Sequence, residues 1–510
     1  MTPPSTQKTG APRSLWRNRE FVALWSGQVV STLGAQTSGT AMPLLVLGTT
    51  GSPSDAGIVA ASGTLPYLIA HLPAGALVDR WNRRTVLLVS ELCAGLALLT
   101  VPAALWLGRV TVAHLAAVAF VQGLCFVFFG LAERAALPGI VPTSLLPTAI
   151  AHNEARARGA ALVGPPLGGA LFGISRTLPF LADALSYFAA CVGLLFIRTD
   201  LRNRPTTPAE SLWRSTTAGL RWVWRHPLIR AALLLIALSN LVFHALVLIL
   251  VVLARHHGAT PTAIGTMLGI YSAGGLAGAL AATRLHRHFT PRSVIIGANW
   301  IWAALLPLFS FTSDPLLIGA IGAATAFVGP LWNVVIISYG TVLVPSELLG
   351  RVNSAAMTLS WGVMPVASLG AGYLLTTVGP VGAVWALAAL MLAAAIAATA
   401  SPAVRSAPPL PTTEESAPRP SISAYAVAAV EGEDDMAETQ LTHKQALAAV
   451  IQALGGTWDT ERAVLALRVA GYEPTGDEAA GKEARRNLRE LAEDGLIERP
   501  DPEQAVYRLA

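Results

Sequence analysis

Long runs without a charged side chain are the feature that most constrains this sequence. Within the first 350 residues, seven such runs are at least 21 residues long: 21–54, 56–78, 110–132, 231–254, 256–283, 293–313 and 315–346. A helix needs roughly 20 consecutive apolar residues to cross the hydrocarbon core of a bilayer. Each run can therefore form a transmembrane helix, and the sequence predicts a polytopic membrane protein.

Further segments raise the expected number of spans. Residues 352–404 contain no charge over 53 positions, and the turn-forming stretch TTVGPVG divides them into two helices. Three more apolar segments, 85–108, 150–175 and 177–197, contain one or a few internal charges. The predicted fold is therefore all-α, with twelve transmembrane helices.

The charges that remain are unevenly distributed. The first 400 residues hold 24 of the 35 Lys and Arg residues but only 11 of the 30 acids, whereas residues 430–510 hold 17 acids and 9 bases. The formal net charge of +5 averages two unlike parts. It therefore does not argue for nucleic-acid binding.

Basic residues also predict the orientation of the chain in a cytoplasmic membrane. With the N-terminus inside, only three of the 24 basic residues among the first 400 fall on the outer face: Arg109, Arg176 and Arg255. This distribution follows the positive-inside rule. Both termini are then cytoplasmic. The expected organisation is an N-terminal tail (1–19), a six-helix half (20–198), a cytoplasmic central loop (199–227), a second six-helix half (228–401), a linker (402–440) and a cytoplasmic domain (441–510).

The two halves repeat each other. AGAL at 74–77 recurs at 277–280, and IVP at 140–142 recurs as LVP at 343–345 with the same offset of 203. Repeated halves around a midplane site are typical of secondary transporters.

One cytoplasmic loop combines an acid with several arginines. The stretch GALVDRWNRR (75–84) resembles the signature loop between helices 2 and 3 of the major facilitator superfamily. A positive-inside anchor would explain the arginines but not the acid. The resemblance implies a conformational latch between the halves, with Gly75 allowing close helix packing and Asp79 capping a neighbouring helix terminus. The expected latch residues are Gly75, Asp79, Arg80, Arg83 and Arg84, with Glu347 and Arg351 bracing the inner gate.

Other stretches are similar to the drug and siderophore exporter branch, of the enterobactin-exporter and macrolide-efflux type. They are 21–59, FLADALSYFAA (180–190) and VPSELLGRVNSAAM (344–357), and the resemblance covers roughly residues 15–400. It implies proton-coupled efflux of small amphipathic molecules by alternating access, through antiport. The partners implied are a small-molecule substrate, protons and the lipid bilayer.

The stretch ALVGPPLGG (161–169) resembles the antiporter motif of helix 5, which bends against helix 8. Its motif residues are Gly164, Pro165, Gly168 and Gly169. Ordinary small-residue packing is the alternative, and the prolines favour the motif because they add a helix bend. Gly274 and Gly278 are the expected partners on helix 8.

Charges inside the hydrocarbon cost about 2.5–3.5 kcal/mol each on insertion scales, so each needs a reason. Glu91 is the first candidate for a proton-accepting carboxylate, and a static ion pair with Arg156 or Arg158 is the alternative. Asp183 and Glu133 are further candidates, although a helix N-terminus and the membrane interface give them structural explanations. Residues expected to offer polar or aromatic groups to the substrate cavity are Gln28, Gln36, Arg158, Asn240, Trp332, Asn333 and Trp361.

ATP hydrolysis is not expected as the energy source, because the sequence contains no nucleotide-binding loop. The three cysteines fall inside spans and offer no disulfide framework. Enzymatic activity, a cofactor or a metal site is not expected. The linker is rich in Pro and then in acids, and is therefore expected to be disordered. Residues 441–510 read as three helices and a short hairpin, similar to a winged helix. A regulatory partner is the default for this domain and nucleic acid is unlikely, because its region is acidic. The alternative to a transporter is a membrane-tethered sensor whose tail regulates transcription.

Overall fold

The computed structural model divides the chain into two compact units, Met1–Leu410 and Pro411–Ala510, which we describe separately. The residues that the structure describes are 14–199, 201, 221, 223–285, 289–344, 352, 356–357, 360–406, 444, 447–448, 451, 457–469, 477–498 and 507–509.

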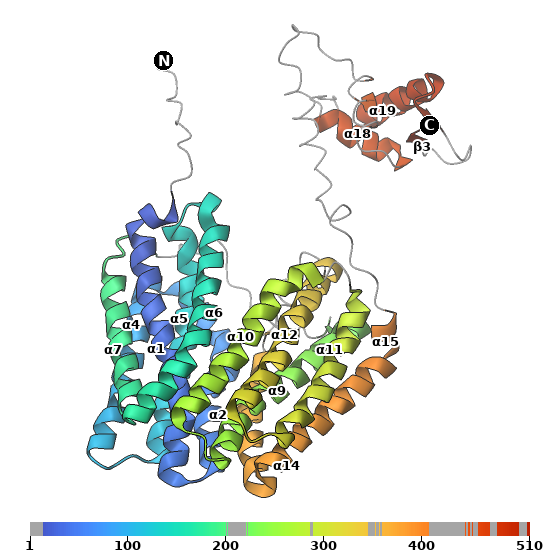
Figure 1. Ribbon diagram of the computed structural model, residues 1–510. Helices are drawn as coiled ribbons and strands as arrows, with labels where there is room; N and C mark the ends of the chain where they lie inside the picture. Colours follow the sequence, from blue (N-terminus) through green and yellow to red (C-terminus); the bar gives the residue numbers. More distant parts are fainter. Residues whose placement is uncertain are drawn as a thin grey trace. The chain divides into compact units, whose positions relative to one another are not determined.

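The first unit is helical in every described segment longer than a turn (Figure 1). Its N-terminal half contains η1 (Leu15–Arg17), α1 (Arg19–Thr50), α2 (Pro53–Ile69), α3 (His71–Arg80), α4 (Arg83–Trp106), α5 (Val112–Ile140), η2 (Thr143–Leu145), α6 (Leu146–Ile174) and α7 (Leu178–Leu195). Its second half contains α9 (Pro227–His256), α10 (Pro261–Leu285), α11 (Pro291–Leu305), η3 (Leu306–Phe311), α12 (Pro315–Leu343), α14 (Met364–Ala400) and α15 (Pro402–Arg405).

Eight helices among the described residues are long and apolar enough to cross a membrane. The number is nine if α2 and α3, which meet at an angle of 63°, form one broken span. These figures support a polytopic membrane protein, whereas the expected number of twelve spans is not confirmed. One reason is that α14 joins two helices across Gly379, whose φ of 71° is not helical.

Local sequence signals set where several of these helices begin and end. Pro53 opens α2, and the Ser52 hydroxyl accepts a hydrogen bond of 3.2 Å from the Asp55 amide. Proline at the first helical position and serine before it are both favourable, because the first amides have no partner inside the helix. Gly51 ends α1 with a φ of 67°, a backbone conformation that glycine adopts without strain.

The halves contact each other through two close helix crossings. Where α2 crosses α14, a Cβ added to Gly57 would lie 2.9 Å from the Gly372 Cα; where α6 crosses α10, a Cβ on Gly169 would lie 2.9 Å from the Gly265 Cα. Gly57 and Gly265 are each the fifth residue of their helix, in SPSDAG and TPTAIG. Both crossings therefore use a helix that starts with proline and reaches its glycine one turn later. Backbones can approach this closely only where no side chain intervenes.

The second unit contains β1 (Thr457–Trp458), α18 (Thr460–Val469), α19 (Asp477–Glu493), β2 (Ile497–Glu498) and β3 (Tyr507–Leu509). The strands form an antiparallel sheet in the order β1-β3-β2, so a third strand joins the expected hairpin. Trp458 is buried in the core of this unit, and the Arg462 guanidinium lies 4.4 Å from the centre of its ring. The first expected helix falls mostly outside the described residues, so a winged helix is not confirmed.

Candidate functional site

A cavity of about 630 Å³ lies within the N-terminal half of the first unit. Side chains of α1, α4, α5, α6 and α7 line it. Much of the wall is apolar or aromatic, including Phe126 and Phe129. The charged lining residues are Glu91, Glu133, Arg134, Glu154 and Arg156.

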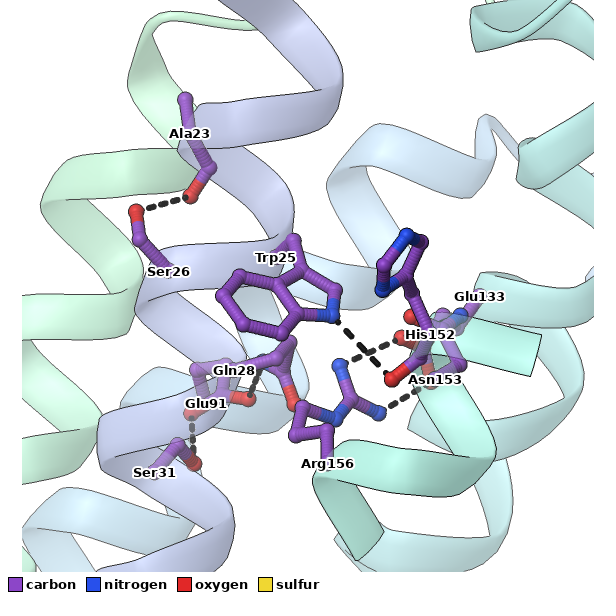
Figure 2. A network of polar contacts seen from close by, with 10 residues as sticks. All are labelled: Ala23, Trp25, Ser26, Gln28, Ser31, Glu91, Glu133, His152, Asn153 and Arg156. Atoms are coloured by element: carbon purple, nitrogen blue, oxygen red, sulfur yellow. Dashed lines mark hydrogen bonds and ion pairs between the residues drawn. The ribbon is translucent and has the colours of Figure 1, made fainter. Parts of the chain in front are cut away.

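Glu91 is buried in this cavity with neutral partners. Its side chain is 3% exposed, and its two carboxylate oxygens accept hydrogen bonds from the Gln28 amide at 2.7 Å and from the Ser31 hydroxyl at 3.1 Å (Figure 2). Both donors lie on α1, one helical turn apart. Among the described residues, no basic group lies within ion-pair distance of this carboxylate. The expected alternative, a static pair with Arg156 or Arg158, is therefore not observed.

Arg156 instead pairs with Glu133. The guanidinium donates two hydrogen bonds to the two carboxylate oxygens, at 3.0 and 3.3 Å, and the side chains are only 8% and 12% exposed (Figure 2). Asn153 donates a further hydrogen bond of 3.5 Å to the same carboxylate. Glu133 thus joins α5 to α6 by a nearly buried bidentate ion pair, a geometry that fixes both side chains.

Arg158 does not line the cavity, contrary to the expectation. It forms an exposed ion pair of 2.9 Å with Glu154, one turn earlier on α6. Two positions apart on a helix means a rotation of about 200°, so Arg156 and Arg158 point to nearly opposite sides. Of the two arginines, the one that lines the cavity is Arg156.

Asp183 carries a second buried carboxylate, which lies outside the cavity lining. It is fully buried and accepts hydrogen bonds from the Ser38 hydroxyl of α1 at 2.5 Å and from the Ser186 hydroxyl at 3.2 Å. A Cβ on Gly34 would overlap this group, so the missing side chain makes room for it. Asp183 is the sixth residue of α7, and its side-chain partners are a hydroxyl of α1 and a hydroxyl of α7 itself. The expected stabilisation by the N-terminus of α7 stays a prediction.

Two of the other expected cavity residues lie on α1 and have different environments. Gln28 lines the cavity and holds Glu91. Gln36 packs against the backbone of α6 at Gly164 and is not a lining residue.

The expected cavity residues of the second half do not line this cavity. Asn240 donates a hydrogen bond of 3.1 Å to the Ser360 carbonyl, Asn333 is exposed, and Trp332 packs edge-on against the Trp302 ring. Trp361 packs against Tyr67 with ring centres 5.2 Å apart, beside the break between α2 and α3.

The loop between α3 and α4 is held by its arginines. Arg83 donates a hydrogen bond of 2.9 Å to the Ala135 carbonyl of α5, and Arg84 donates one of 2.9 Å to the Leu195 carbonyl at the end of α7. A positive charge is favourable at a helix C-terminus, where carbonyls have no helical partner. Arg80, at the end of α3, is exposed.

Gly75 and Asp79 differ from the expectation. A Cβ on Gly75 would meet nothing within 4 Å, so this glycine does not mediate close packing here. Asp79 is exposed, and the cap of α4 is Asn82, whose side chain accepts from the Arg84 amide. Glu347 and Arg351 lie outside the described residues.

The helix-5 motif lies on α6 and faces two helices. Gly164 and Gly168 contact α1 at Gln36 and Thr37, whereas Gly169 contacts α10 at Gly265. Pro165, inside α6, is buried, and its carbonyl lies against Gly265. The expected partners are wrong, because Gly274 and Gly278 pack against α12, whereas Gly265 and Gly269, earlier on α10, contact α6.

Sequence reasoning missed two polar members of the cavity. The Tyr187 hydroxyl of α7 donates a hydrogen bond of 2.9 Å to the Gln122 side chain of α5, which in turn donates to the Ala94 carbonyl of α4. Both residues line the cavity next to Glu91. The sequence signal that could have identified them is a polar side chain within an apolar span, because amide and phenol groups there need hydrogen-bond partners.

Comparison with known proteins gives a family and a fold. The family model described as transmembrane secretion effector matches residues 11–431. The multidrug efflux pump Tap of Mycolicibacterium fortuitum is 28% identical over 378 residues, which cover 72% of this chain and 91% of the pump. Tap of Mycobacterium tuberculosis (strain ATCC 25618 / H37Rv) is also 28% identical, over 420 residues covering 76% of this chain and 94% of the pump.

Among solved structures, a bacterial homologue of the iron transporter ferroportin, in an inward-facing state, superposes with a TM-score of 0.60 at 17% identity. The alignment covers 76% of this chain and 99% of that one. The likeness establishes the transporter fold of the first unit. None of these relatives is described as a sensor or regulator, so the alternative function receives no support.

Proposed function

Because the chain belongs to the transmembrane secretion effector family of the major facilitator superfamily, we propose that it exports small amphipathic molecules in exchange for protons. The two Tap relatives, both named multidrug efflux pumps, support export as the direction and drugs as the substrate class. A largely apolar cavity with a few polar groups suits such substrates. Alternating access between two halves would carry them across.

The proposed topology has twelve spans with both termini in the cytoplasm. α1 and α6 contain 32 and 29 residues, which at 1.5 Å per residue exceed a hydrocarbon core of about 30 Å. Counting both as spans, α2 with α3 as one and the two parts of α14 as two gives twelve. The positive-inside distribution of Lys and Arg supports the orientation.

The burial of Glu91 in the cavity, without a basic partner among the described residues, is the observation that carries proton coupling. An isolated charge costs much free energy in a low-dielectric environment, and a proton removes that charge. Glu91 can therefore take up a proton on one side of the membrane and release it on the other. Glu133 and Asp183 are weaker candidates, because Arg156 neutralises the former and the latter lies outside the cavity lining.

We also propose that the loop between α3 and α4 acts as a conformational latch between the halves. Asp79 would fasten one state of the transport cycle, and Glu347 and Arg351 would brace the inner gate. Arg83 and Arg84 hold the loop to α5 and α7. Gly164, Pro165, Gly168 and Gly169 would keep α6 close to α1 and α10. The second unit would bind a regulatory partner.

The test is efflux of a fluorescent dye from cells with and without a protonophore. We expect protonophore-sensitive efflux by the natural protein and loss of uphill efflux in Glu91→Gln, which keeps the size of the side chain but cannot take up or release a proton. Asp314→Asn, at the exposed start of α12, is the matched control and should transport normally. Unchanged uphill efflux by Glu91→Gln would assign Glu91 a structural role.

A further inference from the structure

The second unit carries a row of basic side chains along one face of α19. Four exposed bases follow each other at intervals of three and four residues: Lys482, Arg485, Arg486 and Arg489. Because successive residues of an α-helix are rotated by about 100°, the four fall within about 100° around the helix axis. The opposite side of α19 carries Ala484, Leu488 and Leu491, which are buried in the core of this unit. We call the four exposed bases the basic stripe.

Acids beside the basic stripe have partners of their own. The Lys444 ammonium lies 2.7 Å from the Asp494 carboxylate and 3.6 Å from that of Glu490. The Arg486 guanidinium lies 2.6 Å from the Glu483 carboxylate. The net negative charge of this region is therefore not spread evenly over the unit, and one face remains basic.

Three members of the basic stripe, Lys482, Arg485 and Arg489, have no acidic partner among the described residues. Like charges one turn apart destabilise a helix. Glu493 is exposed one turn beyond Arg489 and marks the end of the stripe. An anionic partner would relieve the repulsion between the three bases.

The surface of the second unit indicates that this partner is recognised by charge alone. None of the large apolar side chains that are exposed among the described residues belongs to this unit. Protein interfaces usually contain buried apolar or aromatic anchors, and amphipathic helices that insert into membranes expose large apolar side chains. The stripe is therefore suited to a polyanionic surface that it contacts without inserting.

Chain connectivity favours the membrane among the polyanions. Residues 407–443 join α15, at the end of the last proposed span, to the described part of the second unit. A connection of that length reaches at most about 130 Å, so the unit cannot move farther than this from the membrane. Each Lys or Arg beside an anionic leaflet favours binding by about fivefold. Such weak contacts suffice for a tethered surface, whose effective concentration is high, but not for free nucleic acid, which the acids of the unit repel.

From these observations we propose that the basic stripe of α19 docks on anionic phospholipid headgroups of the cytoplasmic leaflet. The inference rests on the proposed topology and names the partner of the second unit. Docking is electrostatic, so it depends on the lipid composition and on the salt concentration.

The test is hydrogen exchange, followed by mass spectrometry, of the full-length protein in nanodiscs. One set of discs contains phosphatidylcholine alone, and the other contains phosphatidylcholine mixed with phosphatidylglycerol. We expect the amides of α19 to exchange more slowly in the anionic discs. The difference should vanish in 1 M salt, where the Debye length is only about 3 Å.

A double variant and a control assign the effect to the stripe. Arg485→Gln with Arg489→Gln removes two of the four bases, which should weaken docking about 25-fold and abolish the slowing in anionic discs. Its exchange in neutral discs should match that of the natural protein, which shows that the unit is folded. Glu461→Gln, at an exposed position of α18, is the control and should keep the slowing.

Equal exchange of the natural protein in both kinds of disc would overturn the inference without any variant. Slowing that persists in the double variant would also overturn it, because another surface would then bind the lipid. If duplex DNA added to neutral discs slows exchange of α19 while phosphatidylglycerol does not, the partner is nucleic acid and the inference fails. Nanodiscs expose both leaflets and carry no gradient, so these outcomes are independent of transport, and the dye-efflux assay alone decides the proposed function.

Discussion

The crossing of α2 and α14 allows a sharp test of the packing between the halves. In Gly57→Ala, the new Cβ would lie 2.8 Å from the Ser368 carbonyl oxygen and 2.9 Å from the Gly372 Cα. Favourable contacts between carbons lie at about 3.5–4.0 Å, so the two backbones must separate by roughly 0.5–1 Å. Overpacking of this kind costs about 1–3 kcal/mol, because both contacts are with backbone and cannot rotate away.

Gly370→Ala is the matched control. Gly370 lies on α14, the partner helix in this crossing, and a Cβ there would meet nothing within 4 Å. Both variants gain the better helix propensity of alanine, roughly 1 kcal/mol, and this gain cancels in the comparison. We expect Gly57→Ala to be less stable than Gly370→Ala by about 1–3 kcal/mol in the free energy of unfolding, measured by titration with sodium dodecyl sulfate. Equal stability of the two variants would refute a tight crossing.

Two further predictions concern ion pairs. Arg156→Leu leaves the nearly buried Glu133 without its cation and should lower the free energy of unfolding by about 3–5 kcal/mol. Arg158→Leu removes an exposed pair and should cost about 0–1 kcal/mol in the same titration, so similar losses would contradict the difference in burial. In the second unit, the hydrogen bond to Asp494 raises the pKa of Lys444 above its ordinary value. The stabilisation from this pair is present at neutral pH and should be lost as the pH rises above about 10.4, which hydrogen exchange of the full chain near Lys444 would detect.

The sequence predicts the character of the first unit well, because membrane insertion depends on composition. A run without charges forms a helix in a bilayer whatever its neighbours, so the helices of the described segments could be expected. Glu91 could be singled out for the same reason, since an acid in an apolar span is costly.

The side-chain directions could not be predicted, because they depend on how each helix is rotated and tilted. The sequence makes Arg156 and Arg158 equally good ion-pair partners for Glu91. Only the rotation of α6 about its axis decides that Arg156 lines the cavity. The glycine partners of α6 on α10 depend in the same way on where the two axes cross. The packing role of Gly75 rests on a resemblance alone, and a motif does not specify which residues lie beside the glycine in a given conformation. In this structure a Cβ on Gly75 meets nothing within 4 Å.

The hydrogen bonds of the two buried acids also bear on how the first unit assembles during synthesis. Gln28 and Ser31 precede Glu91 in the chain, and Ser38 precedes Asp183 by 145 residues. When α4 and α7 leave the ribosome, α1 has therefore already been made, and its hydroxyl and amide donors are available to both acids. α4 and α7 can therefore satisfy their buried carboxylates by packing on α1, whereas the charge-free spans of the second half contain no acid that needs such donors.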